Sequence, residues 1–129
     1  HKGGLLLIDY GFMKPKNIST LQSIKAHKKN YVFNNIGNSD ITSLVNFKLL
    51  KEYLSNNNLT LNKIVSQSFF LKRIGILDRA KIISRKMSFK EKSDLYFRLH
   101  RLLDPSQMGE LFKVIFAYKS KKKFFLGFN

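Results

Sequence analysis

An aspartate, a tyrosine and a glycine directly follow a run of aliphatic residues near the start of the chain. The run is Leu5-Leu6-Leu7-Ile8, and Asp9, Tyr10 and Gly11 close it. Four consecutive aliphatics that end in polar residues are typical of a short strand buried on both faces of a parallel sheet. Open α/β sheets bind their ligands at the carboxyl ends of such strands, so Asp9 and Tyr10 are candidates for ligand contacts. The structural alternative is that Asp9 only caps the turn after the strand.

A second set of candidates lies in residues 11–46, which the sequence predicts to be a long and largely irregular excursion. Its stretch 34–40 consists largely of asparagine, glycine, serine and aspartate, which favour turns and tolerate left-handed backbone. Loops of this length inside compact domains are usually functional. We therefore expect the excursion to carry side chains that contact a ligand.

The next elements must hold these two stretches in place. Asn46 predicts the N-cap of a helix through Ser55, and residues 59–67 alternate imperfectly, as in a half-exposed strand at a sheet edge. Ser68 predicts the cap of a short helix that Gly75 ends.

The second half of the chain predicts two longer helices and a strand. The first helix has apolar residues at helical spacing: Ile76, Ala80, Ile83 and Met87. A capping box over residues 88–91 opens the second, whose apolar stripe is Leu95, Leu99, Leu102 and Leu103 and which residues 104–105 stop. Residues 111–118 are apolar on both faces except for Lys113, which predicts an interior strand. The element order therefore indicates an α/β fold with an antiparallel finish to an otherwise parallel sheet.

Composition restricts the function classes further. The 129 residues carry a net charge of +16 and no cysteine, which excludes disulfides and thiolate metal sites in this chain. The charge suggests nucleic acid or an anionic membrane surface, but lysine is spread along the whole sequence. Only the lysine clusters at residues 25–29 and 121–123 are dense enough to produce a local positive electrostatic field. No apolar run has the length of a membrane span, and a buried strand directly after His1 predicts that an N-terminal part is missing.

Five short motifs, which recur in a fixed order over nearly the whole chain, carry a family resemblance. They are Gly3-Gly4-x4-Asp9-Tyr10-Gly11; Thr20-Leu21-Gln22 with His27; Gly37-x2-Asp40-Ile41-Thr42-x2-Val45-Asn46-Phe47; Phe70-Leu71-x3-Gly75-Ile76; and Met108-Gly109-x-Leu111-Phe112-Lys113-Val114. In this set the chain resembles the C-terminal portion of the MidA-type S-adenosylmethionine-dependent methyltransferases. That family includes a mitochondrial complex I assembly factor that methylates an arginine of a complex I subunit. The chain departs from it at Asn46, where the family usually carries Asp.

The resemblance implies the C-terminal part of a class I (Rossmann-like) methyltransferase sheet within one domain over residues 1–129. Three strands would lie in the order first, last, middle, with an antiparallel final strand. Residues 11–46 would be a substrate-side loop insertion and residues 119–129 a tail. The family's glycine-rich cofactor loop and the carboxylate for the cofactor ribose belong upstream, so S-adenosylmethionine would be held mainly by the missing N-terminal part. The chain alone is then expected to be inactive.

An arginine acceptor requires carboxylates that hold its planar guanidinium, whereas methyl transfer from a sulfonium needs no metal. Five of the eight acidic residues fit helix surfaces, caps or stops: Glu52, Asp78, Glu91, Asp94 and Asp104. Glu110 is ambiguous because it precedes the last strand. The remaining two, Asp9 and Asp40, are the predicted substrate-binding carboxylates, supported by Tyr10, Gln22, His27 and Thr42. As structural alternatives, Asp40 would only form an N-cap or Asx-turn, and His27 would be an ordinary surface histidine.

Three function classes follow from the sequence. The first is the C-terminal segment of a methyltransferase that acts on a protein, for which the resemblance suggests a subunit of respiratory complex I. The second is a basic nucleic-acid-binding module, against which the lack of any helix-turn-helix, zinc-finger or RRM signature argues. The third is a protein-assembly module without catalysis. The resemblance implies a cytoplasmic location in bacteria and a mitochondrial one in eukaryotes.

Overall fold

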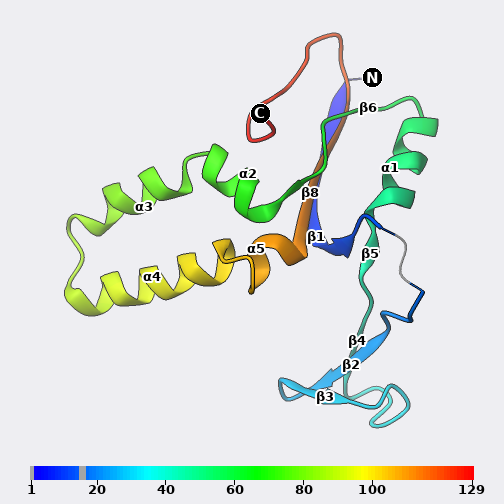
Figure 1. Ribbon diagram of the computed structural model, residues 1–129, viewed down its shortest axis with the longest axis horizontal. Coiled ribbons are helices and arrows are strands. Elements are labelled where there is room, and N and C mark those ends of the chain that lie inside the picture. Colours follow the sequence, from blue (N-terminus) through cyan, green and yellow to red (C-terminus); the bar gives the residue numbers. More distant parts are fainter. Residues whose placement is uncertain (1, 15–16) are drawn as a thin grey trace.

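A computed structural model describes residues 2–14 and 17–129 of the chain; residues 1, 15 and 16, which include part of the predicted excursion, lie outside the described residues. In the described ranges the chain forms a five-stranded main sheet, a separate three-stranded sheet and five helices (Figure 1). The mixed α/β composition agrees with the predicted fold class.

The main sheet is organised around the pairing of β1 (Gly3–Phe12) with β8 (Phe112–Lys119). The two strands are antiparallel over their length, from Gly3 opposite Lys119 to Tyr10 opposite Phe112. The short strand β5 (Val45–Asn46) runs parallel to the end of β1, and β6 (Thr60–Leu61) and β7 (Val65–Ser66) pair with the other side of β8. The order first, last, middle and the antiparallel final strand are thereby confirmed.

The predicted strand 59–67 is interrupted. From Leu61 to Val65 the chain advances four residues, while their partners Ala117 and Val114 are three apart, so one additional residue breaks the ladder. Asn62 lies at the break, where its N–H donates to the Phe116 carbonyl (3.0 Å). Two short strands therefore replace the single expected one, both on the far side of β8.

The core lies between β8 and the helix that precedes β6. Phe47 and Ile115 are fully buried and cluster with Leu54 and Ala117. The expected burial of the first strand on both faces is not found: Leu5, Leu6 and Ile8 are 46%, 46% and 43% exposed. Along most of its length, one edge of β1 has no neighbouring strand among the described residues, because β5 pairs only with Gly11 and Phe12.

The helices follow the predicted pattern with one corrected cap. Asn46 caps α1 (Phe47–Asn56) by accepting from the Leu49 N–H. Helix α2 (Gln67–Arg73) is capped by Ser66, which accepts from the Phe69 N–H, so the prediction of Ser68 as the cap is wrong. Because Ser66 still pairs with β8 as the last residue of β7, the helix begins directly after it, and Ser68 is buried within α2.

Helices α3 (Ile76–Ser84) and α4 (Phe89–Leu103) extend together to one side of the main sheet (Figure 1). The predicted capping box of Ser88 and Glu91 opens α4. Its predicted apolar stripe is half-buried, whereas Phe89, Tyr96 and Phe97 on the remaining surface are exposed. Helix α5 (Met108–Leu111) then leads into β8. Among the described residues, no helix combines the length and the apolar character that crossing a membrane requires.

The stretch 11–46 is more regular than predicted. It contains β2 (Gln22–Lys25), β3 (Lys28–Asn30) and β4 (Asp40–Thr42), which form an antiparallel sheet in the order β3-β2-β4. Figure 1 shows this small sheet beyond β5, apart from the main sheet. Strands of three or four residues are too short to produce a recognisable alternation, which is why the sequence suggests an irregular excursion.

Candidate functional site

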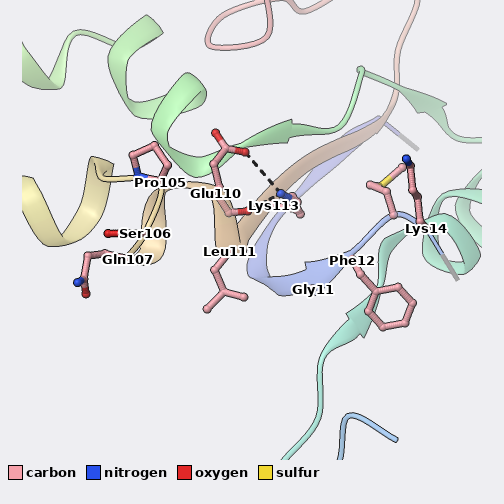
Figure 2. A pocket seen from close by; sticks show the side chains of 10 residues that line it. Gly11, Phe12, Lys14, Pro105, Ser106, Gln107, Glu110, Leu111 and Lys113 are labelled. Atoms are coloured by element: carbon pink, nitrogen blue, oxygen red, sulfur yellow. Dashed lines mark hydrogen bonds and ion pairs between the residues drawn. The ribbon is translucent and has the colours of Figure 1, made fainter. Parts of the chain in front are cut away.

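An open pocket of about 700 Å³ lies at the carboxyl end of β1. One wall is formed by residues 11–14, and the other by residues 105–107 together with Glu110, Leu111 and Lys113 (Figure 2). The pocket thus lies at the sheet edge where the sequence predicts ligand contacts. In open α/β sheets this edge is the usual binding position.

Two glycines allow close packing next to the pocket. A Cβ at Gly11 would overlap the Val45 carbonyl oxygen and lie 2.7 Å from the ring of Phe47. A Cβ at Gly109 would overlap the carbonyl group of Leu103 and lie 2.7 Å from the Asp104 carbonyl oxygen. The chain therefore uses glycine at both positions to bring β5 against β1, and α5 against the end of α4.

The charged residues that line the pocket are Glu110, Lys113 and Lys14, and the first two contact each other. The Lys113 Nζ lies 3.8 Å from the Glu110 Oε2 and also donates to the Glu110 carbonyl oxygen. The Glu110 side chain is 54% exposed and the Lys113 side chain 20%. Figure 2 shows the pair between the loop at residues 105–107 and the end of β1. Glu110 is thus the carboxylate that the sequence left ambiguous, and its spacing of three from Lys113 was the available signal.

A rigid turn supports the wall at residues 105–107. The Asp104 Oδ1 accepts hydrogen bonds from the Ser106 N–H (2.8 Å) and from the Ser106 hydroxyl. These bonds, the one from the hydroxyl first, lower the pKa of Asp104, and the nearby His100 acts in the same direction. The His100 Nε2 lies 3.3 Å from the Asp104 Oδ2, so the end of α4 and the pocket wall are tied together.

The predicted residues Asp9 and Tyr10 lie in β1 and are half-buried. The Asp9 Oδ1 accepts from the Tyr10 N–H (2.8 Å). Because β1 continues to Phe12, Asp9 lies within the strand and does not cap the turn after it. The Tyr10 ring makes an edge contact with Phe112, with centroids 5.5 Å apart. Asp9 and Lys113 are direct cross-strand partners, so Asp9 is linked to the pocket through Lys113 without lining it.

Gln22, Asp40 and Thr42 lie together on the small sheet. Gln22 pairs with Thr42, and Asp40 pairs with Ile24, two residues further along β2. Since side chains alternate along a strand, all three predicted residues share one face of this sheet. The Thr42 Oγ1 is buried and has no hydrogen-bond partner among the described residues. Asp40 is exposed within β4, so it does not cap a helix.

His27 lies apart from these three residues. It is the second residue of the two-residue turn between β2 and β3, with φ +60°, after Ala26 with φ +49°. The side chain is exposed at the tip of the hairpin. The structure therefore groups Gln22, Asp40 and Thr42, keeps Asp9 and Tyr10 on the main sheet, and leaves His27 at a turn. None of the six predicted residues lines the pocket.

Comparison with known proteins identifies the family of this chain. A family described as "Putative S-adenosyl-L-methionine-dependent methyltransferase" matches residues 1–65, about half of the chain. The chain belongs to this family. Its sequence and its pocket at the sheet edge thus agree with the resemblance to MidA-type methyltransferases.

Similar proteins are found among curated sequences and solved structures. The chain is 32% identical to the mitochondrial protein arginine methyltransferase NDUFAF7 of Xenopus tropicalis and 29% identical to that of Danio rerio, over 86% of its own length in each case. It spans about a quarter of each relative, 26%.

A crystal structure of a COG1565 superfamily protein from Burkholderia thailandensis matches 98% of the chain with a TM-score of 0.90 and 27% identity. A second member from the same organism, bound to S-adenosyl-homocysteine, matches 98% of the chain with a TM-score of 0.79 and 26% identity. The chain covers 36% and 33% of these two proteins.

Three glycines of the described residues pack closely against the rest of the chain. At Gly4, Gly11 and Gly109, a Cβ would meet atoms of the chain itself, so none of these glycines leaves space for a ligand. No group of three or more His, Cys, Asp or Glu residues suited to a metal ion occurs in the described part of the chain. What this chain offers is a pocket wall with one carboxylate and a second polar face on the small sheet.

Proposed function

We propose that the full-length protein transfers a methyl group from S-adenosylmethionine to an arginine side chain of another protein. The observation that carries this proposal is the similarity over 86% of the chain to proteins named as arginine methyltransferases. The pocket at the carboxyl end of β1, with Glu110 in its wall, supports the proposal because a guanidinium requires carboxylates. The resemblance to the MidA-type methyltransferases suggests a complex I subunit as the acceptor.

In this proposal the described residues hold the acceptor. Bound S-adenosylmethionine supplies a methyl group on a sulfonium, and its binding site is expected to lie mainly outside this chain. Glu110 binds the guanidinium, for which its half-exposed carboxylate exchanges part of its contact with Lys113. Lys113 remains attached to the Glu110 carbonyl and keeps the wall in place. Holding the guanidinium in line with the donor is the contribution of these residues to the reaction.

The face of the small sheet provides the second half of the proposed acceptor site. Asp40, Gln22 and Thr42 lie side by side there, and the Thr42 hydroxyl lacks a partner in the described part of the chain. We assign these side chains to backbone and side-chain contacts of the protein substrate. In eukaryotes the site of action is the mitochondrion, as in the names of the relatives, and in bacteria it is the cytoplasm.

The test is a methyl-transfer assay with the full-length protein and labelled S-adenosylmethionine. The acceptors are a recombinant complex I subunit mixture and the same mixture with its arginines blocked by a dicarbonyl reagent. Label that mass spectrometry locates on an arginine, and that blocking removes, supports the proposal. Label on lysine or on carboxylates, or none with any acceptor, contradicts it. The 129-residue chain alone is expected to show neither turnover nor a heat of binding with S-adenosylmethionine in calorimetry.

A further inference from the structure

The segment after β8 is basic and then aromatic. It contains Lys121, Lys122 and Lys123, followed by Phe124-Phe125-Leu126-Gly127-Phe128, and no acidic residue follows Glu110 in the sequence. Figure 1 shows this segment leaving the end of β8, reversing direction and returning toward α2. The segment neither lines the pocket at the end of β1 nor belongs to the small sheet.

The segment ends in a tight turn whose two ends are anchored. The Phe128 N–H donates to the Phe125 carbonyl (2.9 Å), and Gly127 has φ +82°. Such a turn requires a residue that tolerates a positive φ in its third position. At Gly127 a Cβ would overlap the ring of Phe70, so glycine is also required by space.

Two aromatic rings fix the turn to the body of the protein. The Phe124 ring contacts that of Tyr118 at 5.1 Å, and the Phe128 ring contacts that of Phe70 at 5.2 Å between centroids. The side chain of Asn62 donates to the Phe124 carbonyl (2.6 Å). The turn is therefore attached to the body of the protein through Phe124 and Phe128.

The residues between these anchors face solvent. Leu126 at the apex is 80% exposed and Phe125 is 51% exposed. The three lysines directly before them are exposed as well. The anchored turn thus exposes an apolar tip that is preceded by three positive charges.

We propose that residues 121–128, the basic-aromatic turn, dock on an anionic lipid surface. Leu126 and Phe125 insert between the lipids, and the three lysines remain at the level of the headgroups, where their charge is complementary to anionic phosphates. A lipid surface requires no shaped complementary pocket, and the apex offers only apolar side chains for contact. This inference is independent of the proposed methyl transfer.

The experiment is vesicle flotation with the full-length protein. Vesicles of phosphatidylcholine and phosphatidylglycerol in equal amounts are compared with vesicles of phosphatidylcholine alone. The triple variant K121Q/K122Q/K123Q should bind the anionic vesicles about 100-fold more weakly, because each lysine near such a surface contributes about a fivefold gain. Leu126→Ser should weaken binding about tenfold, since the inserted apolar side chain is lost.

Matched controls distinguish binding through this turn from binding that depends only on the net charge or on any exposed apolar side chain. The variant K81Q/K86Q/K90Q removes the same charge from α3, α4 and their connection, and Ile36→Ser replaces a 74% exposed aliphatic on a loop near the small sheet. Both controls should bind the anionic vesicles like the unmodified protein. Thermal unfolding followed by circular dichroism establishes that Leu126→Ser is folded.

Binding that is equal for neutral vesicles, or that Leu126→Ser leaves unchanged, overturns the proposal. The proposal is also overturned if K81Q/K86Q/K90Q weakens vesicle binding as much as K121Q/K122Q/K123Q does, because binding would then depend on net charge alone. If single-stranded RNA displaces the protein from the vesicles and binds it with the same loss in K121Q/K122Q/K123Q but none in Leu126→Ser, the turn is a nucleic-acid contact instead.

Discussion

Asp9 and Lys113 stand directly opposite each other in the β1–β8 ladder. Lys113 also forms the ion pair with Glu110, 3.8 Å from Nζ to Oε2. Its ammonium group therefore belongs to a side chain that faces one carboxylate across the sheet and contacts another in the pocket wall. This relationship joins the sequence-predicted Asp9 to the pocket, whose lining includes Glu110 but not Asp9.

Glu110→Gln should reduce kcat/KM for the protein acceptor about 10- to 100-fold in the full-length enzyme, since a hydrogen bond to a charged group is replaced by a neutral one. Because the Glu110 side chain is 54% exposed, the thermal unfolding temperature of the variant should differ little from that of the unmodified protein. Glu52→Gln, an exposed glutamate in α1, is the control and should keep full activity. Unchanged kcat/KM in Glu110→Gln would remove this residue from the acceptor site.

Asp40→Ala should abolish methylation of the full-length enzyme and leave folding intact, because Asp40 is exposed on β4 and lies beside Thr42 on the proposed substrate face. Initial rates and circular dichroism measure the two effects. Asp94→Ala in α4 removes the same charge at a distance from both faces and should behave like the unmodified enzyme. If Asp40→Ala turns over at the rate of the unmodified enzyme, Asp40 has no role in substrate binding.

Gly11→Ala should destabilise the protein by about 1–3 kcal/mol, because the added methyl overlaps the Val45 carbonyl and the ring of Phe47. Gly3→Ala is the matched control in the same strand, since no heavy atom lies within 4 Å of its Cβ position. Chemical denaturation gives both free energies of unfolding. A loss in Gly3→Ala as large as that in Gly11→Ala would show that overlap is not the cause.

The capping box should give α4 an acid-sensitive contribution to stability. Hydrogen bonds from the Ser88 hydroxyl and then from its N–H lower the pKa of Glu91 below 4.5 in the folded protein. The carboxylate therefore stabilises the fold above the unfolded-state pKa, and this contribution is lost as the pH falls through the lowered value.

Unfolding temperatures measured from neutral to acidic pH test the capping box. Glu91→Gln and Ser88→Ala should both flatten the decline below about pH 4.5, the first by removing the charge and the second by removing a partner. If both variants keep the full decline of the unmodified protein, the acid sensitivity originates elsewhere.

The sequence predicted the main sheet because its strands carry strong local signals. Residues 111–118 are apolar on both faces, which indicates an interior strand, and β8 differs from this prediction by one residue at each end. The capping box and the cap at Asn46 are equally local and were found correctly. At the start of α2, Ser66 and Ser68 are equivalent as caps in sequence, and only the pairing of Ser66 with β8 decides between them.

The small sheet and the pocket could not be predicted in this way. The pairing of residues 22–24 with 40–42 joins segments that are far apart and too short to alternate visibly. No sequence pattern indicates the four-residue helix α5, which holds Glu110 in the pocket wall. Whether Asp9, Tyr10, Gln22, His27, Asp40 and Thr42 contact the substrate stays a prediction, and the structure locates them on three separate parts of the fold.

The position of β8 between β1 and the β6–β7 pair has a consequence for synthesis on the ribosome. The strand that joins both halves of the main sheet is made after the other described strands, so residues 3–10 of β1 pair only with a strand about a hundred residues later in the sequence. Until then its aliphatic side chains are open to wrong associations. The β1–β8 ladder of a nascent chain can therefore close only after residue 119 has been made.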